Sequence, residues 1–275
     1  MNKSKQLQTR AQPSPRCELS GGQVIDKIAS WGPQDALLRL RLRKHYLVSL
    51  GCKISGLDQP LSLRSCAEGL VMTLPWIPGV DLAAYAQSRA DSAAMGLLPM
   101  SEIVAIGHKL AVLIAEIADL GVVHGAIKAR HVVIDPSSGS VTLIDFGESQ
   151  FMRSLSADPN PVKIDHNNDL FALGQLLFWL ATRQHIHDGR ANRMWTPTDY
   201  SLEAIRHLPL SFNRILIGLL NAGSRQGYKH ARAVATDLAQ YDEAVNSTSD
   251  DLGRPPDLLL PLARFGREPE IHGLV

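Results

Sequence analysis

The chain has 275 residues and a mass of 30.0 kDa, and it is 45% hydrophobic and 20% charged. This composition allows a substantial core in one large domain or two small ones. The 28 basic and 27 acidic residues leave a net charge of +1, which excludes the broad basic surface of a nonspecific nucleic-acid binder. No apolar run approaches the ~18 residues that span a bilayer, and no apolar stretch follows the basic start as in a secretory signal, so we expect no membrane insertion.

The cysteines Cys17, Cys52 and Cys66 lie far apart and without metal-ligand spacing. An odd number of scattered cysteines is typical of a reducing compartment rather than of a disulfide framework. We therefore expect a cytoplasmic protein.

The N-terminal part of the sequence predicts a small α+β unit. Residues 1–20 are polar and are expected to be a mobile tail, and residues 22–28 read as a short strand. Residues 33–45 combine a helical leucine pattern (Leu37, Leu38, Leu40, Leu42) with a strand-like alternation at 39–43. We favour a helix, because Asp35 would lie in its first turn and Arg43 and Lys44 in its last. Strands are expected at 46–54 and 68–74.

After Pro78-Gly79 the pattern becomes helical. Residues 101–120 carry one long apolar stripe, with Ser101 as the expected N-cap and Gly121 as the stop. Short strands at 131–134 and 141–144 surround a Pro/Ser/Gly turn, and the almost wholly apolar 169–182 predicts a central buried helix. Further helices are expected near 201–207, 210–221 and 229–245.

The segment GVVHGAIKARHVVIDPSSGSVTLIDFG at 121–147 resembles the catalytic loop and Asp-Phe-Gly motif of eukaryotic-like protein kinases. The order of a long helix, a His-containing loop, strand–turn–strand, Asp-Phe-Gly and a buried helix led by Asp also matches that family. The residues that carry the match are His124, Lys128, Asp145, Phe146, Gly147 and Asp169.

This resemblance implies a two-lobed α+β fold with a reduced N-lobe (21–77) and a mainly helical C-lobe (78–245). It also implies ATP and Mg²⁺ as cofactors, with Lys27, Asp81, Lys128 and Asp145 as nucleotide-binding candidates and Asp145 as a metal ligand. For His124, Phe146, Gly147 and Asp169 it implies structural roles. Lys27 would be the strand lysine of the family, and its acidic helix partner would fall near Asp35; the alternative is that these are two surface charges, because only eight residues separate them. Asp81 could contact ribose or simply cap a helix.

The departures from the family pattern concern the chemistry itself. Phosphoryl transfer uses a carboxylate to accept the proton of the attacking hydroxyl and oxygen ligands to hold magnesium. Ala126 stands at the carboxylate position and His131 at the position of the metal-binding Asn, and imidazole is a poor ligand for Mg²⁺. Gly21-Gly22 do not make the G-x-G-x-x-G loop that covers the phosphates.

Two further family features are absent together. The segment from Asp145 to Asp169 is short and contains no Ala-Pro-Glu, and Gly227 stands where the Arg that pairs with that Glu would lie. Losing one member of a buried ion pair would leave an uncompensated charge, whereas losing both need cost little. The pattern is typical of a fold kept after its catalysis was lost.

A second resemblance lies at the end of the chain. Residues 263–271 (ARFGREPEI) are similar to the segment that precedes the P-loop ATPase domain of large bacterial signalling proteins, which also contain a histidine kinase. We therefore expect 246–263 to be a linker and 264–275 to be the start of such a domain. The partners implied are these ATPase and histidine-kinase domains, or another protein.

The sequence thus favours a pseudokinase, a regulatory or scaffolding module in bacterial signal transduction. The alternative is an atypical active Ser/Thr kinase, which would rely on Lys27, Lys128 and Asp145. A small-molecule phosphotransferase of the aminoglycoside-kinase type is a third reading, but it too requires the missing carboxylate.

Overall fold

The computed structural model describes residues 16–20, 24–92, 97–151, 166–186 and 199–247. The expected tail at 1–15, the linker from 248 to 263 and the segment 264–275 lie outside the described residues. The strands are β1 (Arg16–Ser20), β2 (Val24–Ser30), β3 (Ser62–Ser65), β4 (Gly69–Pro75), β5 (Val80–Asp81), β6 (Val122–Val123), β7 (Val132–Ile134), β8 (Val141–Leu143) and β9 (Gln150–Phe151). The helices are α1 (Ala36–Gly51), α2 (Leu82–Ser92), α3 (Met100–Asp119), α4 (Asn167–Thr182), α5 (Asp199–Arg206), α6 (Leu210–Leu220) and α7 (Ala231–Ser247).

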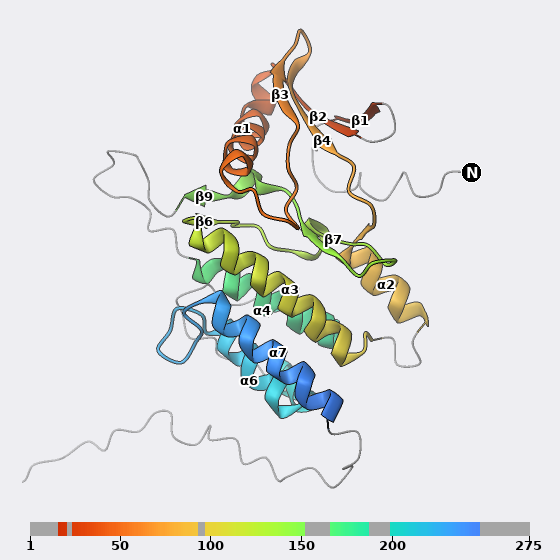
Figure 1. The fold of residues 1–275 in the computed structure, drawn as a ribbon, viewed down its shortest axis with the longest axis vertical. Helices are drawn as coiled ribbons and strands as arrows, with labels where there is room; N and C mark the ends of the chain where they lie inside the picture. The colour runs from red at the N-terminus through yellow and green to blue at the C-terminus, as the bar shows by residue number, and fades with distance from the viewer. Residues whose placement is uncertain (1–15, 21–23, 93–96, 152–165, 187–198, 248–275) are drawn as a thin grey trace, which may run out of the picture.

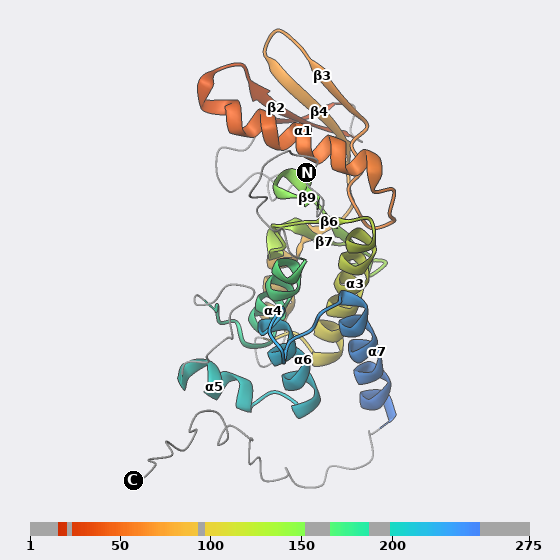
Figure 2. The same ribbon diagram turned by 90° about the vertical axis from the view of Figure 1, so that its left-hand side faces the viewer.

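An antiparallel sheet of order β1-β2-β4-β3 forms the N-terminal part, and α1 lies across one of its faces (Figures 1 and 2). Alternating side chains of β2 and β4 point toward α1 and make a small core. That core consists of Ala29, Leu42, Leu70, Met72 and Leu74. The expectation of a tail through residue 20 is wrong in its last part, because residues 16–20 pair with β2 as an edge strand.

Helix α1 is longer than predicted, and the strand expected at 46–54 is wrong. Leu42, His45, Val48 and Ser49 recur at helical spacing and are all buried, so tertiary packing overrides the strand propensity of the 46–50 segment. The basic residues therefore lie mid-helix rather than in the last turn. The leucines at 37–42 do not share one face either, since Leu42 is buried whereas Leu37 and Leu40 are exposed.

The C-terminal part is a helical bundle around α3 and α4, with α7 packed on α3 and α6 on α4 (Figure 1). As predicted, α4 is buried almost all round. Ser101 is not the N-cap of α3, because the carbonyl of Pro99 accepts the N–H groups of Glu102 and Ile103, so that the helix starts two residues earlier. Gly121, at φ 73°, takes the left-handed conformation that ends α3, as expected. None of the described helices is long and apolar enough to cross a membrane.

Short strands lie between the two parts. The predicted hairpin is present as β7 and β8, and β5 pairs with β7 at its edge. The turn is closed by Asp135, whose carboxylate accepts hydrogen bonds from Ser137 and Ser138. His131 directly precedes β7, and Asp145 follows β8. Both residues therefore lie at the open end of the hairpin, side by side.

The turn after α6 has no room for a side chain at Gly227. An ideal Cβ built there would lie 1.8 Å from the carbonyl oxygen of Asn221. The neighbouring Tyr228 fixes this turn, because its N–H bonds to Gly218 and its hydroxyl donates to Asp237. The backbone here therefore excludes an arginine, in agreement with the missing ion pair noted in the sequence.

We expect Gly227→Ala to destabilise the fold by at least about 2 kcal/mol, because the new Cβ overlaps backbone atoms that cannot move independently. Urea denaturation measures the effect. Gly51→Ala is the matched control, since nothing lies within 4 Å of a Cβ at that position and the change should stay within about 1 kcal/mol. Equal stability of the two variants would contradict this account of the turn.

Candidate functional site

The backbone of Asp145 has an unusual conformation. Its φ of 70° and ψ of 69° lie in the left-handed region. Asp145 is one of only two non-glycine residues with a positive φ in the described part of the chain. This conformation disfavours an L-residue by roughly 1 kcal/mol or more, so the surroundings must hold it. It turns the chain from β8 into the short helix Phe146–Glu148 and presents the Asp145 side chain between the two parts of the molecule.

A buried carboxylate holds this turn. The Asp145 N–H donates to Oδ2 of Asp58 at 3.2 Å, and the other oxygen of Asp58 lies 3.0 Å from Nε2 of His45. The side chains of His45 and Asp58 are only 1% and 3% exposed. Burial alone would raise the pKa of Asp58, but the charge and hydrogen bond of His45, then Lys27 and the Asp145 N–H, outweigh it and lower the pKa. One charged group thus links α1, the loop after it and the Asp-Phe-Gly turn.

Phe146 lies in the interior between two imidazole rings. Its ring centroid is 5.9 Å from that of His45 and 4.6 Å from that of His124, the latter in an edge-on arrangement. Gly147 allows α1 to pack closely on this turn, because a Cβ at Gly147 would lie only 3.1 Å from Cβ of Arg41 on α1. Arg41 in turn pairs with Glu148.

Both ring nitrogens of His124 are used within the site. Nε2 donates to the carbonyl of Ile144 at 3.2 Å, and Nδ1 accepts the N–H of Ala126. Burial, with the nearby His131, lowers the pKa of His124 to about 4, so the ring is neutral at physiological pH. The structure therefore places His124 as a packed, hydrogen-bonded group.

Asp145 keeps the electrostatics of a cation-binding carboxylate. Burial would raise its pKa, but the charges of Lys27, His131 and His45 prevail and lower it to about 2. Lys27, on the inner strand β2, is near enough for its charge to act on Asp145, but the two side chains form no salt bridge. The expected partner near Asp35 is wrong: Asp35 accepts hydrogen bonds from the Ser30 N–H and hydroxyl instead.

His131 lies directly beside Asp145. Its Nδ1 is 2.8 Å from the carbonyl oxygen of Ala126, and its Nε2 is 3.3 Å from Oδ2 of Asp145. Because a carbonyl only accepts, Nδ1 must carry the proton. Burial, outweighing the attraction of Asp145, lowers the pKa of His131.

These two side chains do not fit Mg²⁺ as a pair. Asp145 offers a hard oxygen, but the position beside it offers an imidazole, and Mg²⁺ prefers near-octahedral oxygen ligands. Within the described ranges, no group of three His, Cys, Asp or Glu side chains could hold a metal. We therefore derive no metal-dependent step.

Asp169 braces the loop that contains Ala126. Its two carboxylate oxygens accept the N–H groups of His124 and Gly125 at 2.7 and 2.8 Å. Complete burial raises the pKa of Asp169 to about 6, although these hydrogen bonds act in the opposite direction. Asp169 is thus committed to the backbone and only 1% exposed.

Asp81 lies apart from this group, whereas Lys128 is near enough for its charge to lower the pKa of His131. The carboxylate of Asp81 accepts the N–H of Ala84 at 2.9 Å and so caps α2. Lys128 is exposed at the start of the 3-10 turn Ala129–His131. The structure brings together Lys27, His124, His131, Asp145 and Phe146, but it does not add Asp81.

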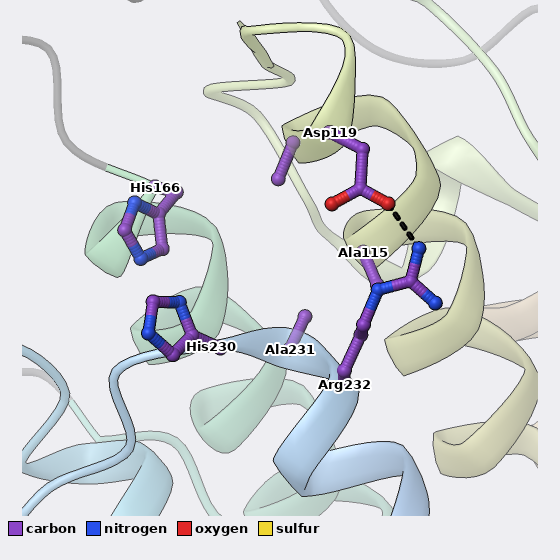
Figure 3. A pocket seen from close by; sticks show the side chains of 7 residues that line it. Ala115, Asp119, His166, His230, Ala231 and Arg232 are labelled. Carbon is purple, nitrogen blue, oxygen red and sulfur yellow. Dashed lines mark hydrogen bonds and ion pairs between the residues drawn. The ribbon is translucent and has the colours of Figure 1, made fainter.

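A shallow cavity of about 270 Å³ lies elsewhere, where the end of α3 meets the starts of α4 and α7 (Figure 3). His166 and His230 stack at 5.9 Å on one side, and Arg232 pairs with Asp119 on the other. Its opposite charges are already matched, and no residue of the Asp145 group lines it.

Comparison with known proteins depends on structure alone. No family model matches the sequence, and no curated protein matches it. Many solved structures match, among them the kinase domain of Mycobacterium tuberculosis PknI, with a TM-score of 0.61 over 84% of this chain and 92% of that domain at 16% identity. The chain has a protein-kinase-like fold. The predicted α+β class and the kinase resemblance are therefore confirmed, whereas the roles of individual residues remain predictions.

Sequence reasoning missed the residues that hold the kinase-like site in place. His45 is the last residue of the segment predicted as a helix, but no motif marks it as a site residue, and Asp58 lies in a loop with no motif. One signal was available: His45 falls three residues from both Leu42 and Val48, on the apolar face of a helix. A polar residue on such a face requires a buried partner.

We expect the His45–Asp58 pair to be energetically coupled. His45→Leu leaves a buried carboxylate with one partner fewer, and Asp58→Ala removes the acceptor of Asp145, so each should cost about 3 kcal/mol. The double variant should lose about 1–3 kcal/mol less than the sum. A urea-denaturation cycle measures this, with the exposed pair Asp119 and Arg232 as the control cycle, expected below about 1 kcal/mol. Additive losses at His45 and Asp58 would contradict the coupling.

Asp169 should give stability a characteristic pH dependence. Its pKa is about 6 in the folded chain against an ordinary 3.8, so the folded state binds the proton more tightly. This group therefore reduces stability as pH rises through the range from about 4 to 6. Asp169→Asn should remove that component, on the order of 2–3 kcal/mol, in denaturation curves measured from pH 4 to 7. The exposed Asp119→Asn serves as control, and an unchanged pH slope in Asp169→Asn would refute the assignment.

Proposed function

We propose that this chain is a pseudokinase: a kinase-like regulatory or scaffolding module of bacterial signal transduction that acts through protein contacts rather than phosphoryl transfer. The observation that carries the proposal is Ala126. Its methyl group stands where the family has a proton-accepting carboxylate, and its N–H and carbonyl are taken by His124 and His131.

The described carboxylates around Ala126 do not replace the missing base. Asp145, with a pKa of about 2, is a weak proton acceptor, because an efficient base has a pKa near the working pH. Asp169 has a suitable pKa of about 6, but it is buried with both oxygens bound to backbone N–H groups. Glu148 lies close to Gly125, but its carboxylate is paired with Arg41 of α1.

A protein-contact role agrees with what is retained. The left-handed Asp145, the buried Phe146 and the braced loop keep the geometry of the kinase-like site without its chemistry. Any ATP bound at Lys27 and Asp145 would act by stabilising the arrangement of the two parts, since a ligand shifts a conformational equilibrium only through its differential affinity. The free thiols of Cys52 and Cys66 agree with a reducing compartment such as the cytoplasm.

An atypical active Ser/Thr kinase is the second candidate. It is favoured by one observation: the charge of Lys27 helps to lower the pKa of Asp145, which keeps that carboxylate ionised. Positioning and charge stabilisation supply most of the catalysis of phosphoryl transfer, so loss of the base does not abolish slow turnover in principle.

Incubation with γ-labelled ATP and Mg²⁺ or Mn²⁺ separates the two candidates. We expect label incorporation, into the chain itself or an added acceptor protein, to be no greater for the wild type than for Asp145→Ala. Circular dichroism of both proteins controls for folding. Incorporation by the wild type that Asp145→Ala abolishes would refute the pseudokinase proposal and establish the active kinase.

A further inference from the structure

The outer face of α1 carries an exposed row of leucines. Leu37, Leu40, Leu47 and Leu50 are between 52% and 60% exposed, whereas no other described element exposes more than two large hydrophobic side chains. Figure 2 shows α1 in front of the sheet, with no described element covering its outer side. Single exposed leucines are ordinary, but a row on one helix face indicates an interaction surface.

The row has the spacing of a helix-pairing seam. Leu37, Leu40, Lys44, Leu47 and Gly51 alternate at intervals of three and four residues, the repeat with which two helices pack along their length. A single Lys within such a seam is a known device for selecting one partner over another. The apolar stripe is narrow, because Arg43 is exposed next to Lys44 in its middle.

The charge of α1 has one sign. The helix contains Arg39, Arg41, Arg43 and Lys44 and no acidic residue. Arg39 donates to the carbonyl of Gly32, and Arg41 pairs with Glu148. Arg43 and Lys44, beside the leucines, form no salt bridge with any other residue that the structure describes, so the cations of the seam lack an acidic counterpart there.

The opposite face of the same helix supports the kinase-like site. Arg41 contacts the Asp-Phe-Gly segment through Glu148, and His45 holds Asp58, which fixes the Asp145 backbone. A protein bound to the outer face would thus contact α1, the same helix that supports the Asp145 turn through Asp58.

We propose that this face, the α1 leucine seam (Leu37, Leu40, Lys44 and Leu47, with Leu50 beside it), docks an acidic amphipathic helix of a protein partner. Leucines at heptad spacing on the partner fill the seam, and its flanking Glu or Asp side chains meet Arg43 and Lys44. The inference adds the surface and the partner's chemistry to the proposed scaffolding function.

Charge argues against the other occupants. Pairing with a second copy of α1 would place Arg43 and Lys44 against cations in the absence of any acidic residue on either helix, and like charges across an interface disfavour association. A lipid surface requires a wide apolar face, whereas this stripe is narrow and interrupted by Arg43.

A synthetic peptide tests the proposal with the full-length chain. The probe is a labelled helix of about three heptads with Leu at the seam positions and Glu at the flanking positions, and binding is followed by fluorescence anisotropy. We expect saturable binding that weakens as the salt concentration rises. The double variant Leu40→Ser/Leu47→Ser should reduce the affinity for the peptide at least about tenfold. The matched control is Leu210→Ser/Ile217→Ser, which changes exposed apolar residues on α6 and should leave binding unchanged.

Charge reversal provides the second arm. Arg43→Glu/Lys44→Glu should lose the acidic peptide and gain the same peptide with Lys in place of Glu. No binding of the acidic peptide, or binding indifferent to both α1 double variants, would overturn the proposal. Self-association abolished by Leu40→Ser/Leu47→Ser would assign the seam to a second copy, and α1-dependent binding to phosphatidylserine vesicles would assign it to a membrane. Because this assay reads binding, it fails or succeeds independently of the phosphotransfer experiment.

Discussion

The site depends on one buried carboxylate. Asp58 accepts the N–H of Asp145 and contacts His45, and by doing so it connects α1, the loop that follows it and the turn after β8. A left-handed aspartate and a buried carboxylate are each unfavourable alone. Together they stabilise one arrangement, in which the Asp145 side chain faces Lys27 and His131 while Phe146 is buried between His45 and His124.

The surroundings of two aspartates, Asp145 and Asp169, give their carboxylates opposite pKa shifts. Asp145 lies near Lys27 and His131 and has a pKa of about 2, whereas Asp169 lies among backbone N–H groups in the interior and has a pKa of about 6. The first is suited to attract a cation and the second to support a loop. Neither is suited to take a proton from a substrate hydroxyl at Ala126, and this is the basis of the proposed pseudokinase role.

Helix α1 connects the leucine seam on the surface with the Asp145 turn in the interior. One face of this helix carries the leucine seam and the other carries Arg41 and His45. Since packed interiors respond to displacement by discrete rearrangement rather than by smooth deformation, a partner on the seam and a ligand at Asp145 would bias the same element. Such a link would provide the physical basis of the proposed scaffolding role.

The sequence predicted what depends on local patterns. The apolar stripe of α3, the turn at Asp135 and the Asp-Phe-Gly motif each contain their own signal within a few residues, and all three are present in the structure. The predictions failed where distant residues decide. The extension of α1 through Gly51 is set by burial of Val48 in the core that contains Phe146, Asp35 is taken by Ser30, and Asp58 is buried between His45 and Asp145. No periodicity records these contacts.

The central claim is that the kinase-like turn is already fixed by Asp58 in the chain without nucleotide. Hydrogen–deuterium exchange of the Asp145 amide, measured on the nucleotide-free chain by NMR, tests this most directly. The account predicts exchange slower by orders of magnitude than in an unstructured peptide, with the protection lost in Asp58→Ala. Exchange of that amide at the rate of an unstructured peptide in the wild type would contradict it.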